Sequence, residues 1–123
     1  MKNILVLDDV LDAAIMIKRI LERQGHGVAV FTEEEEAIEY LRLHPVEVAI
    51  LDIRLKKMSG IAMLQEVKRI SPSTRVIMLT GYPTLETARQ ARQLGAFDYC
   101  IKPIDKKDLE DKVAKALAAV GLI

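Results

Sequence analysis

The chain has 123 residues, of which half are apolar, and its 18 basic and 18 acidic side chains give a formal net charge of zero. This length allows one hydrophobic core and is too short for a second. The balanced charge argues against a nucleic-acid or membrane surface, because both usually carry an excess of basic side chains. Aromatic residues make up only 4% of the chain, so a platform that stacks on bases is also disfavoured.

Cysteine content and apolar runs narrow the class of protein further. Cys100 is the only cysteine, so it cannot form a disulfide within the chain, and we expect it to be a small buried side chain. No apolar run reaches the length of a membrane span. The N-terminal sequence MKNILVLDDV has too short an apolar stretch for a signal peptide, and acids follow it at once. We therefore expect a soluble protein of the cytoplasm with no membrane partner.

Strand-like and helix-like segments alternate along the chain. The strand-like segments are short, continuous apolar runs, which are typical of strands covered on both faces in a parallel sheet. Five repeats of strand then helix predict an open, doubly wound α/β domain. In chain order, we expect a strand at 3–8, a helix at 10–25, a strand at 27–31, a helix at 32–44, a strand at 46–52, a helix at 59–71, a strand at 75–80, a helix at 84–95, a strand at 97–102 and a helix at 105–121.

Single residues mark several of the helix ends. Thr32 with Glu35 three residues later predicts a capping box. The four glutamates at 33–36 would lie in the first helical turn, where acids favour the helix dipole, so we expect no separate function for them. Pro72 stops the third helix, and Asp105 is the expected N-cap of the last one.

Polar side chains follow four of the five strands at the point where each strand ends. These residues are Asp8 and Asp9 after the first strand, Asp52 at the third, Thr80 at the fourth and Lys102 at the fifth. In an open parallel α/β sheet, ligands bind outside the carboxyl ends of the strands, near the point where the strand order reverses. We therefore expect the five side chains to meet at one edge of the sheet.

The chemistry of this set is that of a phosphoryl site. Three carboxylates at one place repel each other, and their pKa values rise unless a cation offsets the charge. All the expected ligands are oxygens, which favours Mg²⁺ or Mn²⁺. Lys102 adds a charge suited to a phosphoryl oxygen, and Thr80 can donate a hydrogen bond to another. The set indicates phosphoryl transfer to a carboxylate.

Each of these residues also has a simpler interpretation. Asp8 or Asp9 alone could cap the first helix, Thr80 could merely end a strand, and Lys102 could be a solvated surface lysine. Asp52 is harder to explain in this way, because it follows a buried strand and apolar residues continue after it. The order and spacing of the five residues, rather than any one of them, indicate a site.

The five residues lie in four stretches, VLDD (6–9), VAILDIRL (48–55), VIMLTGY (76–82) and FDYCIKPID (97–105). These stretches resemble the receiver domain of bacterial two-component response regulators, of the chemotaxis-regulator-like superfamily. The resemblance covers essentially the whole chain, residues 1–123, as one receiver domain. It implies a flavodoxin-like (βα)5 fold with strand order 2-1-3-4-5. Both a single-domain regulator and a receiver cut from a longer protein fit the sequence, and the segment GAFDYCIKPID is also similar to receivers of nitrogen-regulation-type transcriptional activators.

The resemblance implies a role for each acidic residue. Asp52 would be the phosphoacceptor, taking its phosphoryl group from a phosphohistidine on a histidine kinase or a histidine phosphotransfer protein. Asp9 would bind Mg²⁺ directly, as would Asp52, and Asp8 would act mainly through a metal-bound water. The backbone carbonyl of Arg54 falls where the family supplies a further metal ligand.

The resemblance also implies how the phosphoryl group is sensed. Thr80 would donate a hydrogen bond to it and move toward it on activation, and Lys102 would pair with a phosphoryl oxygen. Tyr99 matches the switch aromatic of the family, which turns inward as Thr80 moves. The peptide bond before Pro103 is cis in this family, although cis is otherwise a minority state for such bonds.

Three positions depart from the family pattern or tune it. Lys56 stands where the family often has proline, four residues after the phosphoacceptor, so we expect a more flexible and more basic loop. Arg54 and Tyr82 lie two residues beyond Asp52 and Thr80, where receivers control the access of water to the phosphoryl group. A long cation and a bulky ring there lead us to expect slow self-dephosphorylation.

Two surfaces are candidates for partners. The first helix has too many apolar residues for one stripe; we expect Ala13 or Ala14, Ile17, Ile20 and Leu21 to face the sheet. The rest would stay exposed beside the acids, where receivers dock the helical hairpin of the kinase, although wider burial within the domain is the alternative. Helix 4, strand 5 and helix 5 form the output surface of the family. A homodimer could use that surface, or its charges could simply be solvated.

Two other classes of function compete with the signalling switch. A phosphatase of the haloacid-dehalogenase type also uses an aspartyl phosphate, but it places two acids as D-x-D after strand 1, whereas this chain has adjacent acids there. A degenerate receiver would act as an unphosphorylated interaction module, yet all five site residues are present. We therefore expect a phosphoacceptor rather than a turnover enzyme, with no direct contact to nucleic acid, and the lifetime of the phosphoryl group would separate the three classes.

Overall fold

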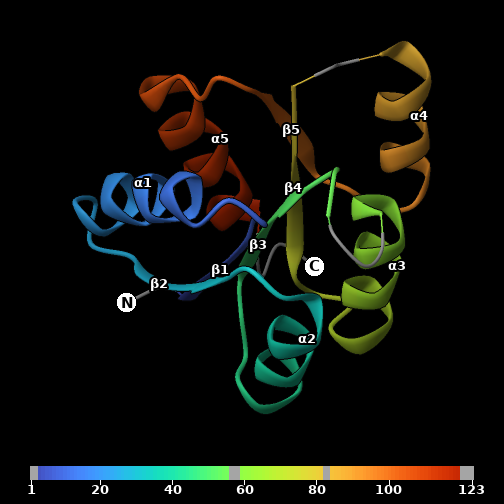
Figure 1. The fold of residues 1–123 in the computed structure, drawn as a ribbon, viewed down its shortest axis with the longest axis horizontal. Coiled ribbons are helices and arrows are strands. Elements are labelled where there is room, and N and C mark those ends of the chain that lie inside the picture. Colours follow the sequence, from blue (N-terminus) through green and yellow to red (C-terminus); the bar gives the residue numbers. More distant parts are fainter. Residues whose placement is uncertain (1–2, 56–58, 82–83, 120–123) are drawn as a thin grey trace.

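The computed structural model describes residues 3–55, 59–81 and 84–119. Within them, strands and helices alternate along the chain (Figure 1). The strands form one parallel sheet in the order β2-β1-β3-β4-β5. This confirms the predicted doubly wound α/β fold and its strand order. The elements are β1 (Asn3–Leu7), α1 (Leu11–Glu22), β2 (Gly27–Phe31), α2 (Glu34–Leu43), β3 (Val48–Asp52), α3 (Gly60–Ile70), β4 (Arg75–Thr80), α4 (Leu85–Gln93), β5 (Asp98–Ile101) and α5 (Lys106–Ala119).

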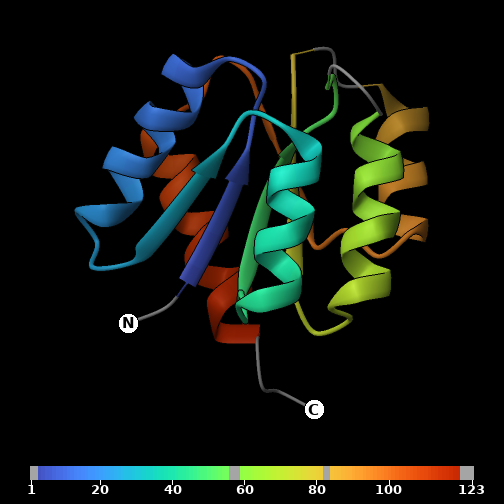
Figure 2. The same ribbon diagram turned by 60° about the horizontal axis from the view of Figure 1, so that its bottom comes forward.

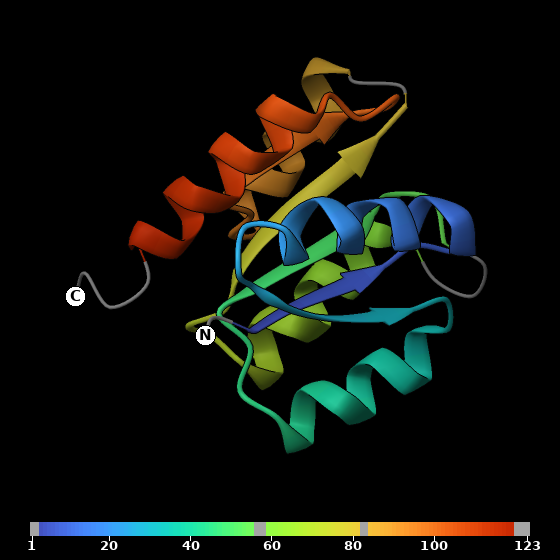
Figure 3. The same cartoon turned by 90° about the vertical axis from the view of Figure 1, so that its left-hand side faces the viewer.

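Helices cover both faces of the sheet and make two apolar cores. Helices α1 and α5 pack on one face, where Ala14, Ile17 and Leu21 of α1 are fully buried (Figures 1 and 3). Helices α2, α3 and α4 pack on the other face (Figure 2). The burial of both faces explains why the strands are continuous apolar runs rather than alternating ones. None of the described helices is long and apolar enough to cross a membrane.

The register of the central strands brings the polar strand ends together. Leu7 pairs with Leu51, so the residues that follow each of them lie side by side at the same edge of the sheet. Asp52 pairs in turn with Leu79 on β4. On the far side of β4, Thr80 pairs with Ile101. The C-terminal ends of β1, β3, β4 and β5 therefore converge, as parallel strands require.

The predicted start of the second helix is wrong. Helix α2 begins at Glu34 rather than Thr32, and Glu33 is the residue at the N-cap position. Thr32 lies one residue before the N-cap position that a capping box requires, and Glu33 at that position makes no side-chain capping hydrogen bond. Glu34 is also not a solvated residue of the first turn, because it is only 1% exposed. The acids still lie in the first turn, as expected from the helix dipole.

Other helix starts carry the caps that their sequences favour. Ser59 Oγ accepts a hydrogen bond from the Ala62 N–H at 3.1 Å and caps α3. Asp105 Oδ2 accepts one from the Asp108 N–H at 2.9 Å, which confirms the predicted cap of α5. After the C-terminal end of α1, the chain turns into β2 at Gly25. This residue has φ of 90°, a conformation that glycine adopts readily.

Candidate functional site

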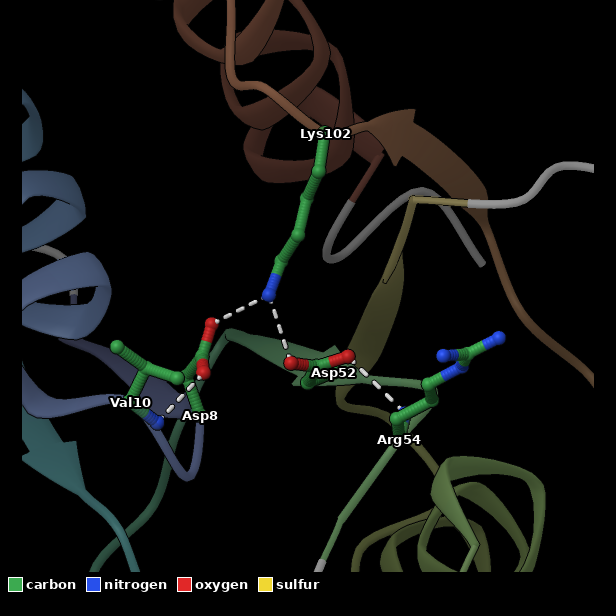
Figure 4. A network of polar contacts seen from close by, with 5 residues as sticks. All are labelled: Asp8, Val10, Asp52, Arg54 and Lys102. Carbon is green, nitrogen blue, oxygen red and sulfur yellow. Dashed lines mark hydrogen bonds and ion pairs between the residues drawn. The ribbon is translucent and has the colours of Figure 1, made fainter.

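The centre of the site is a lysine held between two buried carboxylates. Lys102 Nζ donates to Asp8 Oδ2 at 2.9 Å and to Asp52 Oδ2 at 2.7 Å (Figure 4). The side chain of Asp8 is fully buried and that of Asp52 is 8% exposed, whereas the lysine side chain is 27% exposed. Lys102 reaches the acids from the end of β5, and each acid comes from a different central strand. It is therefore neither a solvated surface lysine nor a local partner of either acid.

The main chain holds the second oxygen of each carboxylate. Asp8 Oδ1 accepts from the Val10 N–H at 2.9 Å, and Asp52 Oδ1 accepts from the Arg54 N–H at 3.0 Å (Figure 4). Both are contacts to the backbone two residues on, which aspartate makes readily in turns. The N-cap position of α1 is taken by Val10, so neither Asp8 nor Asp9 is the cap of that helix. Both carboxylates are thus fixed on two sides.

The pKa values of the pair reflect burial and mutual attraction. Burial raises the pKa of the Asp52 carboxyl above its ordinary value, although the hydrogen bonds from Lys102 and from the Arg54 N–H lower it; the charge of Asp8 adds to the rise. Burial alone would lower the pKa of Lys102, but the hydrogen bonds to Asp52 and Asp8 more than offset this and raise it. Lys102 therefore stays charged at neutral pH, while burial makes the ionised form of the Asp52 carboxyl less favourable than it would be in water.

Asp9 completes an acidic cluster at the same edge. Among the described residues, carboxylate oxygens of Asp8, Asp9 and Asp52 lie within 4.8 Å of one another. One ammonium group and three carboxylates leave a local charge of −2 if all three acids are ionised. Oxygen ligands with this excess charge fit a hard divalent cation such as Mg²⁺, which is commonly held by one or two carboxylates together with waters. The oxygen ligands and the excess negative charge of the cluster therefore fit the divalent metal that the sequence predicts.

An open cavity of about 300 Å³ lies over this cluster. Thr80, at the end of β4, is 7% exposed and lines this cavity together with Asp9 and Asp52. The side chain of Arg54 is directed away from the Lys102 ammonium (Figure 4). A small group bearing oxygens can enter here and meet a carboxylate, an ammonium and a hydroxyl together. The residues that line the cavity are Asp9, Asp52, Ile53, Arg54, Thr80, Gly81 and Lys102.

Tyr99 lies outside this cavity but is connected to it through Thr80. Tyr99 lines a second, apolar pocket with Ile53, Met78, Thr87, Ala88 and Ala91, and Thr80 lines that pocket as well. The peptide bond between Lys102 and Pro103 is cis, as the resemblance implies. Tyr82 and Lys56 lie outside the described residues. The structure therefore brings Asp8, Asp9, Asp52, Arg54, Thr80 and Lys102 to one place and sets Tyr99 one pocket away.

Gly60, which the sequence did not single out, lies against the end of β3. The Gly60 N–H donates to the Ile53 carbonyl oxygen at 2.7 Å. A Cβ at this position would overlap the Asp52 carbonyl oxygen and lie 2.5 Å from the Ile53 Cα. Only glycine allows this approach of α3 to the end of β3. The one signal available was the Ser59-Gly60 pair at the start of a helix, which by itself indicates only a cap.

Part of helix α1 beside the acids is apolar and exposed. Leu11 is 53% exposed and Met16 is 43% exposed, while Ile20 is only partly buried against the core. This confirms that the apolar residues of the helix exceed one stripe. A groove along the helix is lined by Asp12, Ile15, Met16, Arg19, Ile20 and Arg23.

Comparison with known proteins gives one consistent family. A family model described as the response regulator receiver domain matches residues 4–114. The transcriptional regulatory protein ZraR of Escherichia coli O157:H7 is 36% identical over 121 residues, covering 98% of this chain and 27% of ZraR. The response regulator protein PilR of Pseudomonas aeruginosa is 35% identical over 113 residues, covering 92% of this chain and 25% of PilR. The chain thus spans about a quarter of the length of these regulators.

Solved structures agree with the sequence relatives. A receiver domain protein from Clostridium thermocellum has a TM-score of 0.91 and 33% identity, covering 99% of this chain and 98% of that one. NtrX from Brucella abortus in complex with ATP has a TM-score of 0.91 and 30% identity, covering 98% of this chain and 28% of NtrX. The similarity therefore includes both a separate receiver and a receiver within a longer protein.

Proposed function

Since this chain belongs to the response regulator receiver domain family, a family of two-component signalling switches, we propose that Asp52 accepts a phosphoryl group from a phosphohistidine. The observation that carries the proposal is the Asp52 carboxylate fixed at the tip of β3, 2.7 Å from the Lys102 ammonium. In the transfer, an Asp52 carboxylate oxygen forms a bond to phosphorus. The N–P bond of the phosphohistidine breaks, and its electron pair returns to the imidazole.

Lys102 and Thr80 would stabilise the transferred group. The ammonium that now pairs with the Asp52 oxygen would pair with a phosphoryl oxygen instead. Thr80 faces the same cavity, and its hydroxyl would donate to another phosphoryl oxygen. These interactions develop as the phosphoryl group arrives, so they favour the product over the free carboxylate.

Asp8, Asp9 and Asp52, with the backbone carbonyl of Arg54, would hold Mg²⁺. The excess of carboxylate over ammonium charge in the cluster supports this assignment. When bound, the metal would offset the negative charge of the phosphoryl oxygens. Asp9 is less buried than Asp8, which is consistent with a direct ligand at the mouth of the site and an inner acid acting through water.

The phosphoryl donor would be a histidine kinase or a histidine phosphotransfer protein. Leu11 and Met16 are exposed apolar residues of α1, the helix that follows Asp8 and Asp9 in the chain, and they offer a docking surface for helices of such a partner. Receiver domains of this family work with histidine kinases, so the partner class follows from the family. The identity of the kinase would be set by this surface.

Phosphorylation would change the surface made by α4, β5 and α5, through Thr80 and Tyr99. A homodimer could form through this surface. ZraR is named as a transcriptional regulatory protein, so in a longer chain the switch would control a DNA-binding part, while the receiver itself makes no contact with nucleic acid. We place the domain in the cytoplasm and regard it as an acceptor that catalyses its own phosphorylation, not as a turnover enzyme.

The test is the intact mass of the protein after incubation with acetyl phosphate and Mg²⁺. We expect the mass of one phosphoryl group to be added to the wild type, and not to Asp52→Asn or in the presence of a chelator. Lys102→Arg serves as a second variant that keeps the cation but changes its shape, and it should be modified more slowly. Modification of Asp52→Asn at the wild-type rate would show that the acceptor is another residue.

A further inference from the structure

Lys112 on α5 contacts Tyr99 through both the main chain and the ring. Its Nζ donates to the Tyr99 carbonyl oxygen at 2.7 Å. The same ammonium lies 5.5 Å from the centre of the Tyr99 ring, within the range of a cation–π interaction. Asp108, one turn earlier on α5, pairs with it at 3.0 Å. A single ammonium thus joins α5 to the strand and the side chain of one tyrosine.

These contacts fall at the edge of the sheet, where a strand has no neighbour on one side. Strand β5 pairs with β4 alone. The Tyr99 N–H donates to Asp98 Oδ1 at 2.7 Å, and its carbonyl accepts from Lys112. Charged side chains therefore satisfy polar groups of an edge strand that would otherwise need water or another strand. Tyr99 is held by its backbone as well as by its ring.

The apolar pocket connects this contact to the acceptor site. Tyr99 and Thr80 both line it, and Thr80 also lines the cavity over Asp52. The apolar pocket has a free volume of only about 10 Å³, roughly the space of one water. Close-packed groups cannot shift independently into so small a space. A movement of Thr80 toward the acceptor and a movement of the Tyr99 ring would therefore be coupled.

We propose that Lys112 is a positioning residue that holds Tyr99 in the arrangement in which Lys102 pairs with the Asp52 carboxylate, and so opposes the phosphorylated arrangement. The proposal rests on the proposed function, because it takes phosphorylation of Asp52 to move Thr80 and Tyr99. Lys112 is not among the residues that line the cavity over Asp52. It acts by stabilising one of two positions of the tyrosine, and the loss of its contacts shifts the balance toward the other.

The first measurement concerns Tyr99 alone, in the protein without ligand. Tyrosine side-chain rotamer populations are measured by NMR in the wild type and Lys112→Met, which keeps the length of the side chain but not the charge. The signals of Tyr99 are identified with Tyr99→Phe. We expect Lys112→Met to redistribute the Tyr99 rotamers, Lys112→Arg to restore the wild-type distribution, and Lys115→Met, the same change at an exposed lysine of α5, to have no effect.

The second measurement is the affinity for beryllofluoride, a mimic of the phosphoryl group, at saturating Mg²⁺. Lys112→Met should bind it about three- to tenfold more tightly than the wild type, since one cation–π contact and one charge-assisted hydrogen bond are lost from only one of two states. Lys112→Arg should bind like the wild type. Lys112→Gln, which can still donate to the carbonyl but has no charge, should lie between them.

The outcomes separate the two proposals. Unchanged Tyr99 rotamers in Lys112→Met, or unchanged or weaker binding of beryllofluoride, overturn the positioning role while leaving the proposed function intact. No binding by the wild type, with rotamers that do change, overturns the proposed function and with it the link from Lys112 to Asp52. Thermal unfolding of each variant shows whether the fold is kept, and failure of Lys112→Arg to rescue a folded Lys112→Met also counts against the proposal.

Discussion

Replacing Lys102 with methionine should destabilise the fold at neutral pH. The substitution keeps an unbranched side chain of similar length but removes the ammonium that bonds Asp8 at 2.9 Å and Asp52 at 2.7 Å. Two buried carboxylates would then face each other with no charge between them. Breaking a buried ion pair by removing one partner typically costs about 3–5 kcal/mol. Because the lysine side chain is 27% exposed and the cavity beside it is open, we expect about 2–3 kcal/mol.

The free energy of unfolding that Lys102→Met loses should be largest near neutral pH and should fall as the pH falls. The ion pair stabilises the fold only while the carboxylates are ionised, so its contribution falls as pH falls through the pKa of Asp52. That pKa is raised above 3.8 by burial, so the fall begins at a higher pH than for an ordinary aspartate. On the alkaline side, the folded-state pKa of Lys102 is raised above 10.5 by its hydrogen bonds to Asp52 and Asp8, which outweigh burial. Its contribution is therefore complete at neutral pH and is lost only as pH rises through that folded value.

The assay is urea unfolding followed by far-UV circular dichroism, because the chain has no tryptophan. The free energies of unfolding of wild type and Lys102→Met are compared at about pH 7.5 and about pH 4, without divalent metal. We expect the difference to be large at the higher pH and much smaller at the lower one. Lys115→Met controls for the loss of one charge. A difference below about 0.5 kcal/mol at both values of pH, the range of ordinary surface substitutions, would refute the reasoning.

Three further predictions concern other parts of the site and the core. Gly60→Ala should lower the free energy of unfolding by more than about 2 kcal/mol, because the added Cβ would overlap the Asp52 carbonyl oxygen. It should also slow phosphorylation. A wild-type free energy in urea unfolding and a wild-type rate of mass gain would contradict this. Arg54→Ala and Tyr82→Ala should shorten the lifetime of the phosphoryl group, measured as loss of added mass over time, and unchanged lifetimes would refute the shielding hypothesis. Burial raises the pKa of the Cys100 thiol to about 11, so a thiol reagent at mildly alkaline pH should react slowly with the folded chain and rapidly in urea; equal rates would show that the thiol is accessible.

The strands and the gathering of the acids could be predicted because they depend on local patterns. Continuous apolar runs mark strands covered on both faces, and the carboxyl ends of parallel strands share one edge of the sheet. β2 and β4 have the predicted bounds, Gly27–Phe31 and Arg75–Thr80. The predicted helix ends were less accurate. Helix α1 ends at Glu22, three residues before Gly25, because a turn can lie between the last helical residue and the glycine.

Contacts between distant residues could not be predicted from the same patterns. Lys102 lies 94 residues from Asp8 and 50 from Asp52, so the pairing depends on the register of the sheet and on side-chain rotamers. The close approach of Gly60 to the main chain of β3 depends on how α3 packs, which a single glycine does not reveal. The N-cap of α2 was misplaced because a threonine followed by a glutamate fits a capping box in sequence, whereas the chain stays extended through Glu33.

The charges of the site explain why metal should control the rate of phosphorylation as well as its extent. The chain as a whole is neutral, yet Asp8, Asp9 and Asp52 outnumber the two cations at the cavity, Lys102 and Arg54, and leave a local charge of −1 when the acids are ionised. A phosphoryl group carries negative charge, so its approach to this cavity is opposed before any bond forms. A divalent cation cancels the local excess, and the barrier to approach then falls. Rates of phosphorylation by acetyl phosphate should therefore rise with Mg²⁺ concentration, and should do so less steeply in Asp9→Asn, which lacks one of the charges that the metal offsets.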